Sequence, residues 1–309
     1  MDVRHHANPD EIAWRDAQAS KQGLPGLRQA LEQRAALNPD LSGFKLRQAP
    51  LEGVDLSQRG QQAACSLRGA DLYRAHLSHA HLFAVDLREA SLMKADLRGA
   101  NLHCADLRDA NLLGVQLDGA RLDNVIWGTQ VLQERQGRAA AEPTAALDLY
   151  QQAEEIYRNL RLHLERAGLF EQAGQFFYRE MVMRRLRTPR WSGARLMSWL
   201  IDLFCGYGER PLNVVLFSLS QVLCFALAYF ALGVAQGEQQ IGWSGAQDAA
   251  TNLLELATCL YYSVVTFTTL GYGDIVPLGW ARAVAALEAF VGSFTMALFV
   301  VVFVKKMTR

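Results

Sequence analysis

Several features that would indicate an enzyme, a secreted protein or a nucleic-acid binder are missing from this sequence. The 309 residues carry no net charge, which favours neither nucleic acid nor an acidic partner. The first residues contain no apolar core, so we expect no signal peptide at this end. We find no phosphate-binding loop, zinc-ligand spacing or nucleophile elbow. The sequence therefore predicts no enzyme activity and no cofactor.

Cysteine spacing of the kind that builds a metal site or a disulfide framework is also missing. The five cysteines are scattered, and three of them lie in or beside long apolar segments. We therefore predict that all five are small buried hydrophobic residues with reduced thiols. They are Cys65, Cys104, Cys205, Cys224 and Cys259.

Positive charge is nearly absent from the last third of the chain. Between Pro211 and Val304 the only Lys or Arg is Arg282, so a voltage sensor with several arginines is not expected. Two apolar segments, residues 211–233 and 281–304, are long enough as helices to cross a bilayer core of about 30 Å. Basic residues flank the ends that face away from the polar stretch between the segments, which predicts two spans with cytoplasmic N- and C-termini.

The stretch between these spans contains the sequence Thr268-Thr269-Leu270-Gly271-Tyr272-Gly273-Asp274. Two glycines separated by one residue allow backbone conformations that are closed to other residues. A run of alternating handedness would turn successive carbonyl oxygens toward one side. Several such runs around an axis would form rings of oxygen that replace the water shell of a cation.

This stretch resembles the selectivity filter of the potassium-channel superfamily, with Leu270 where valine or isoleucine is more usual. The resemblance covers residues 211–306 and implies a tetrameric pore domain with a re-entrant pore helix at 253–267 and a filter at 269–273. It implies that K⁺, the permeant ion, is held by backbone carbonyls, together with the Thr269 hydroxyl. The ion-conducting filter would comprise Thr269, Leu270, Gly271, Tyr272 and Gly273, with K⁺ bound by Thr269, Leu270, Gly271 and Tyr272.

The same resemblance implies roles for residues around the filter. Support would come from four residues, Thr268, Asp274, Tyr261 and Tyr262. Gly292 lies midway in the second span, where similar channels bend to open; close helix packing is the alternative explanation for this glycine. We expect Glu288 to bond within the pore wall. Val265 stands where many relatives carry a glutamate, so filter closure that relies on this acid is not expected.

A five-residue repeat occupies the N-terminal half. Leucine occurs at every fifth position from Leu67 to Leu122, and a small residue precedes each leucine by two positions. A period of five matches neither a helix nor a flat strand, but it fits a square coil of about 20 residues per turn. The pattern resembles the pentapeptide-repeat family, which implies a right-handed quadrilateral β-helix at 41–128. Leucines before residue 58 are out of phase by one, which predicts a loop at 58–64.

Outward-facing residues of this coil include possible stacked pairs. A step of 20 residues would place His76 beside Asp96 and Asp86 beside Asp106. A His–Asp neighbour could sense pH or hold a metal, but a solvated face is the simpler interpretation. Acidic and basic residues between 41 and 127 are balanced, so the DNA mimicry of some pentapeptide-repeat proteins is not indicated.

Four segments complete the chain. Residues 1–40 are polar and predict a short helical cap over the open end of the coil, and a linker follows the coil as far as residue 142. Residues 143–190 predict a cytoplasmic helical hairpin whose second helix ends in several arginines. Residues 191–205 predict an interfacial helix, because tryptophan beside arginine favours lipid headgroups.

Together these features predict a multidomain membrane protein of the cell membrane, in a bacterium the inner membrane. We predict a homotetrameric, potassium-selective channel, whose gate moves when the β-helix and the helical hairpin pull or press on the interfacial helix and tilt the first span. The bilayer and an unknown cytoplasmic ligand or protein on the repeat domain are its expected partners. Two alternatives stay open, a membrane-tethered interaction scaffold and a weakly selective cation channel.

Overall fold

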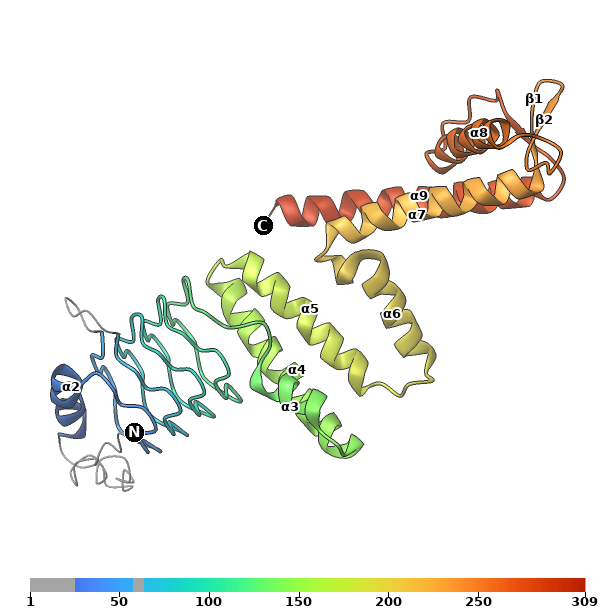
Figure 1. Ribbon diagram of the computed structural model, residues 1–309. Coiled ribbons are helices and arrows are strands. Elements are labelled where there is room, and N and C mark those ends of the chain that lie inside the picture. The colour runs from blue at the N-terminus through green and yellow to red at the C-terminus, as the bar shows by residue number, and fades with distance from the viewer. Residues whose placement is uncertain (1–25, 58–63, 309) are drawn as a thin grey trace, which may run out of the picture. The chain divides into compact units, whose positions relative to one another are not determined.

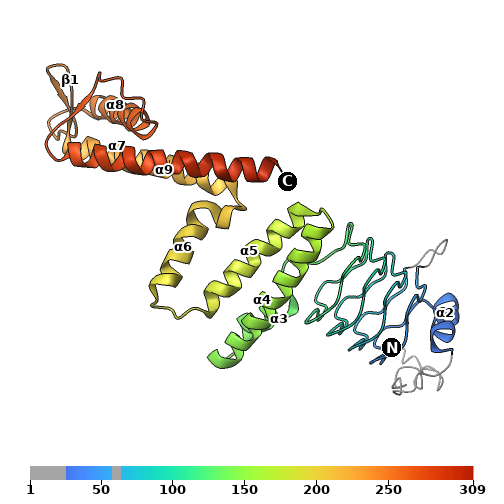
Figure 2. The ribbon, with the colours of Figure 1, turned by 180° about the vertical axis from the view of Figure 1, so that it is seen from behind.

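The structure is a computed structural model that describes residues 26–57 and 64–308. Between Arg190 and Trp191 the chain divides into two compact units. Figure 1 and Figure 2 show the elements of each unit from opposite sides. The first 25 residues of the predicted cap lie outside the described residues, and so does the predicted loop at 58–64 except for Ala64.

A square coil forms the body of the first unit (Figure 1). Parallel backbone bridges join residues 20 positions apart in four columns, such as the column in which Ser66 pairs with Asp86 and Asp86 with Asp106. Four columns mean four faces per turn, as the period of five predicts. The repeated leucines fill the interior, and Leu87 and Leu97 are completely buried. Burial of this leucine stack and its layer of small residues stabilises the coil.

The first turn of the coil is longer than the others. Asp40 pairs with Ser66 and Asp55 with His81, whereas Ser66 pairs with Asp86. The first step therefore spans six more residues than the later ones, one complete repeat plus one residue. This additional residue accounts for the phase shift of the early leucines.

Tight turns form the corners of the coil. In one of them the Ala70 N–H donates to the Leu67 carbonyl at 3.0 Å, and Gly69 between them has φ +65°. A turn with a positive φ at its third residue favours glycine. Other residue types occupy the same corner position elsewhere, and one of these is Cys104, with φ +60°.

The prediction for the cysteines is correct for three of the five. Cys65, Cys205 and Cys259 are buried free thiols, and burial raises the pKa of Cys65 to about 12. The prediction of burial is wrong for Cys104, which is only half-buried because corner side chains point away from the core. It is also wrong for Cys224, which is exposed on a helix face that one chain leaves uncovered.

Helix α2 (Leu27–Leu37) covers the first turn of the coil. Its Arg28 guanidinium donates to the carbonyl of Glu52 at 3.1 Å. Its Glu32 carboxylate accepts from the backbone N–H of Asp55 at 2.9 Å. Both contacts satisfy backbone groups at the open end of the coil, as the predicted cap requires.

Three helices follow the coil: α3 (Leu132–Ala139), α4 (Pro143–Arg166) and α5 (Phe170–Arg187). The prediction of a plain linker before residue 142 is wrong, because α3 occupies most of it. A buried carboxylate fixes α3 in place: Glu134 is fully buried and accepts from the Tyr157 hydroxyl of α4 at 2.5 Å. The sequence did not predict this burial, because Glu134 is one of many polar residues in its segment.

These helices cover the last turn of the coil. The Asn159 side chain of α4 donates to the carbonyl of Val115 at 2.8 Å. The Gln133 side chain of α3 donates to Asn111 at 2.7 Å. Both ends of the coil are therefore covered, which protects its terminal backbone groups from pairing with other chains.

The arginines that end α5 have partners inside the first unit. Arg187 donates to Glu154 at 2.6 Å, Arg184 lies 3.4 Å from the same carboxylate, and Arg179 donates to Glu134 at 3.1 Å. Both glutamates are buried and need positive charge beside them. These three cations therefore stabilise the packing of α5 against α3 and α4.

The second unit contains α6 (Gly193–Cys205), the short helix η1 (Gly206–Gly208), α7 (Pro211–Leu232), α8 (Ala249–Phe267) and α9 (Ala281–Met307). Helices α7 and α9 lie side by side, and α8 packs against one end of this pair (Figure 1, Figure 2). Among the described residues, α7 and α9 are the two helices long and apolar enough to cross a membrane.

The connection between α7 and α8 contains structure that the sequence did not predict. Strands β1 (Val234–Gln236) and β2 (Gln239–Ile241) form a hairpin, and β3 (Val276–Pro277) pairs with the other edge of β1. Helix α8 begins four residues before the predicted start, because the Asp248 side chain accepts from the backbone N–H of Thr251 and caps it. The small sheet ties the end of α7 to the segment that precedes α9.

Candidate ion-conduction site

The segment between α8 and α9 turns back on itself. Helix α8 ends at Phe267, whose carbonyl oxygen lies 2.3 Å from the position that a Cβ on Gly292 would occupy. The end of α8 therefore touches the middle of α9. From there the chain returns to β3, directly before the start of α9. The chain therefore turns back at the end of α8, with the filter segment (residues 269–273) on the returning limb. Its re-entry into a membrane stays a prediction.

The filter segment has an alternating backbone. Thr269, Gly271 and Gly273 have φ values of +58°, +58° and +78°, whereas Leu270 and Tyr272 do not have positive φ. Glycine adopts this conformation without penalty, and for a residue such as Thr269 it costs about 1–2 kcal/mol. A strained threonine next to two glycines is the pattern expected where function, rather than stability, determines the backbone.

The end of α8 holds the start of the filter segment. The Thr268 hydroxyl donates to the carbonyl of Val264 at 2.7 Å. The backbone N–H groups of Thr269 and Leu270 donate to the carbonyls of Thr266 and Val265, each at 3.0 Å. Carbonyls at a helix end otherwise lack partners. The filter segment therefore begins in a position that the helix fixes.

A side-chain contact holds the far end of the filter segment. The Tyr261 hydroxyl of α8 donates to the Asp274 carboxylate at 3.0 Å. Tyr262 is buried and packs against Tyr229 of α7, with ring centroids 4.7 Å apart. Tyr272 is 67 % exposed, so its ring has little cover within one chain. The structure thus places Thr268, Tyr261 and Asp274 directly against the filter segment and Tyr262 behind it.

A cavity of about 340 Å³ lies behind the filter segment. Within the described residues, Asp274 is the only acid in its lining. Val265 contributes an apolar wall at the position where the family resemblance implies a glutamate in many channels. The lining consists of Tyr262, Val265, Thr266, Thr269, Gly271, Gly273, Asp274, Ile275 and Ala289.

A buried carboxylate joins the three long helices of this unit. Glu288 of α9 is fully buried and accepts from the Tyr229 hydroxyl of α7 and the Ser263 hydroxyl of α8, both at 2.5 Å. The prediction that Glu288 bonds within the wall is confirmed. The sequence did not identify its two partners, although a lone acid in an apolar helix requires partners of this kind.

Gly292 has a packing role in this structure. Helix α9 runs without interruption from Ala281 to Met307, and any side chain at position 292 would overlap the Phe267 carbonyl. Close packing, the alternative explanation for this glycine, is therefore observed. Its use as a hinge stays a prediction.

A further contact at the other end of α9 was not predicted. The Lys305 ammonium lies 2.6 Å from the Glu209 carboxylate, in the turn between η1 and α7, and only 5 % of the Glu209 side chain is exposed. Nearby, Cys205, Val214 and Val302 form a small buried cluster. The turn before the first span is therefore fixed to the end of the second.

The stacked pairs on the coil lie as predicted, with His76 beside Asp96 and Asp86 beside Asp106. Over residues 26–57 and 64–308, no group of three or more His, Cys, Asp or Glu side chains is placed to hold a metal ion. The three aspartates instead form ion pairs with Arg88, Arg98 and Arg108 at the surface of the coil.

Comparison with known proteins matches a family to each of two regions of the chain. Residues 216–309 match the ion channel family, and residues 63–99 and 90–126 match pentapeptide repeats, with eight copies. Two curated relatives, the LctB proteins of Geobacillus stearothermophilus and Bacillus caldotenax, are each 35 % identical over 81 and 82 residues. The match covers 26 % of this chain and 60 % of each relative, less than two thirds of their length.

Two solved structures of Nostoc PCC 7120 proteins share the repeat. The pentapeptide repeat protein alr5209 is 30 % identical over 29 % of this chain and 72 % of its own, with a TM-score of 0.19. HetL is 32 % identical over 29 % of this chain and 48 % of its own, with a TM-score of 0.19. The chain thus combines pentapeptide repeats in its N-terminal region with an ion channel domain at its C-terminal end.

Proposed function

We propose that this chain is one of four identical subunits of a potassium-selective channel in the cell membrane, in a bacterium the inner membrane. The alternating backbone at Thr269, Gly271 and Gly273 carries the proposal, because such alternation lets successive carbonyls face one side. The carbonyls of Thr269, Leu270, Gly271 and Tyr272 would then replace the water around K⁺. No cofactor or enzyme activity is required, since conduction is passive.

Exposure of the filter segment supports assembly from several copies. Non-helical backbone is tolerated at membrane depth only where protein or a water-filled path surrounds it. In one chain Leu270 is 59 % exposed and Tyr272 is 67 % exposed, so other copies must supply the missing surroundings. The end of α8 carries a partial negative charge, which would favour a cation near the axis.

For gating, we propose that the cytoplasmic repeat domain acts through α6 on both spans. The sequence suggested a route through α7 alone. The contact between Glu209 and Lys305 adds a direct connection from the turn after α6 to the end of α9. Helix α6 also exposes Leu196, Met197 and Trp199, which suits a helix lying in the headgroup region of the bilayer. Movement of α6 would therefore move the cytoplasmic ends of both spans.

Potassium flux from liposomes separates the channel from an interaction scaffold. Gly271→Ala should abolish flux, because alanine disfavours the φ of +58° by about 1 kcal/mol in each of four subunits at the ion path. Gly245→Ala is the matched control, since Gly245 has open space around it and no positive φ. No flux from the wild type would support the scaffold instead, whereas flux that survives Gly271→Ala at the wild-type rate would contradict conduction through the filter segment.

A further inference from the structure

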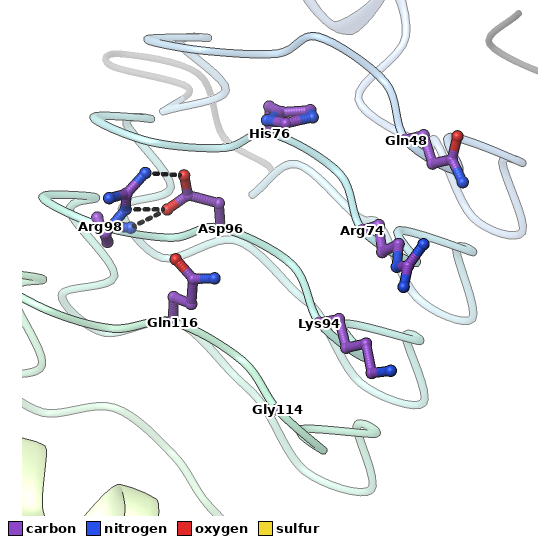
Figure 3. Close-up of a pocket in the computed structure, with 8 residues that line it drawn as sticks. All are labelled: Gln48, Arg74, His76, Lys94, Asp96, Arg98, Gly114 and Gln116. Atoms are coloured by element: carbon purple, nitrogen blue, oxygen red, sulfur yellow. Dashed lines mark hydrogen bonds and ion pairs between the residues drawn. The ribbon is translucent and has the colours of Figure 1, made fainter. Parts of the chain in front are cut away.

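A groove on the outside of the square coil contains a short row of positive charge (Figure 3). Its volume is about 880 Å³, within the range of small-molecule sites. One wall is a column of corner residues on successive turns, and the other is a column on the adjoining face. The lining consists of Gln48, Arg74, His76, Lys94, Asp96, Arg98, Gly114 and Gln116.

The corner column places two cations side by side. The backbone N–H of Arg74 donates to the carbonyl of Met93 at 3.0 Å, so Arg74 and Lys94 lie on hydrogen-bonded turns about 4.8 Å apart. Both have positive φ, and Figure 3 shows their side chains one below the other on the same edge. The Arg74 guanidinium also lies 5.3 Å from the ring centroid of Tyr73, which orients it without neutralising its charge.

These two cations have no carboxylate partner in the described part of the chain. Asp96, the acid in the lining of the groove, is already bound by Arg98, with contacts of 2.8 and 2.7 Å. This pairing also lowers the pKa of Asp96, so the two charges compensate one another. The groove is therefore left with the unpaired charge of Arg74 and Lys94.

The positive row is two residues long. Gln48 precedes Arg74 in the corner column, and Gly114 follows Lys94. The stem of Lys94 packs over Gly114, with 3.2 Å between its Cγ and the position of a Cβ there. A nucleic acid would need a longer track of cations, whereas a small anion with two adjacent charged groups matches this row.

We propose that this groove binds a small molecule that carries a diphosphate. Each of its two phosphates would face one cation of the row, Arg74 or Lys94, because a charged hydrogen bond to phosphate is among the strongest available at a protein surface. The side chains of Gln48, His76 and Gln116 surround the row and provide polar contacts for the rest of the ligand (Figure 3). This binding does not depend on ion conduction.

The test is calorimetric titration of the full-length protein in detergent at low salt, with ADP and pyrophosphate as probes. We expect saturable binding of one probe per chain, with AMP and sulfate about tenfold weaker or more. Arg74→Gln and Lys94→Gln should each weaken ADP binding by about tenfold, the loss of one charged hydrogen bond. Arg68→Gln, on the same coil but outside the groove, should leave the affinity unchanged.

Three results would overturn the proposal. They are the absence of saturable binding, equal affinity for ADP and AMP or sulfate, and equal losses in Arg68→Gln and Arg74→Gln. Circular dichroism of each variant should match the wild type, because all three side chains are exposed and outside the leucine core. Since heat of binding is measured, these outcomes are distinguishable from a failure of potassium conduction.

Discussion

The square coil and the ion channel domain differ in how much of their apolar side-chain surface one chain buries. Within one chain the coil buries its leucines almost completely, and even Leu117, near its end, is only 2 % exposed. The channel domain leaves large side chains open, and Phe290 and Phe294 of α9 are 66 % and 71 % exposed. One chain therefore completes the coil but leaves the channel domain without part of its surroundings.

The two parts therefore depend on different contacts for their stability. The coil gains its stability from contacts between neighbouring turns, so it should not depend on lipid or on other copies. Long helices with exposed apolar faces are stable only when lipid or protein covers those faces. Polar contacts inside one chain, such as that of Glu288, position α8 but do not cover the filter segment.

The largest effect is expected for Gly292→Ala, on the side of the channel domain. A Cβ there would lie 2.3 Å from the Phe267 carbonyl, which the backbone cannot accommodate without moving α8. We expect loss of potassium flux and of the assembled particle, measured by liposome flux and light scattering. Ser293→Ala, an exposed neighbour on α9, is the control. Normal assembly with a gate that fails to open would instead support a pure hinge.

The second-largest effect is expected for Leu87→Ala, inside the coil. Leu87 is completely buried, so its truncation should cost about 2–5 kcal/mol and lower the temperature at which the coil unfolds. Phe83→Ala removes a larger but 43 % exposed side chain from the same turn and should cost less. The measurement is circular dichroism during heating at several protein concentrations. A concentration-dependent midpoint would show that the coil, too, needs other copies.

A smaller effect is expected where Glu288 joins the long helices. Glu288→Gln turns one acceptor into a donor that faces a hydroxyl, and Tyr229→Phe removes one of the donors. Each change should cost about 1–3 kcal/mol of stability of the channel domain. The double variant should cost less than the sum, because both changes break the same contact. Additive losses in thermal denaturation would show that the two side chains act independently.

The smallest effect is expected for Lys305→Gln, at the contact between the two spans. A partly exposed ion pair contributes about 1 kcal/mol or less, so the open probability should change only a few-fold in single-channel recordings. Glu209→Gln should change it in the same direction. Lys306→Gln is the control, because that side chain is exposed and next in the chain. An equal change in the control would indicate a general charge effect.

Much of this fold follows from local patterns in the sequence. A leucine at every fifth position determines the square coil, and two long apolar runs determine α7 and α9. The filter segment is recognisable because its glycines occupy the positions of positive φ, and Thr269 adopts the same conformation between them and α8. In each case the residues that determine the local structure lie within a few positions of one another in the sequence, or one repeat apart.

Contacts between distant residues were beyond the reach of sequence patterns. Helix α3 is held against α4 by the contact of Glu134 with Tyr157, and neither residue indicates the other in the sequence. The ion pair of Glu209 and Lys305 joins a residue that precedes α7 in the sequence to a residue at the end of α9. The packing role of Gly292 depends on the Phe267 carbonyl, which belongs to another helix.

The most direct test is the reversal potential of purified channels in a planar bilayer with potassium on one side and sodium on the other. If carbonyls of the filter segment replace the water around K⁺, the current should reverse close to the potassium equilibrium potential. A reversal potential near zero, which means that potassium and sodium pass equally well, would contradict the potassium-selective channel.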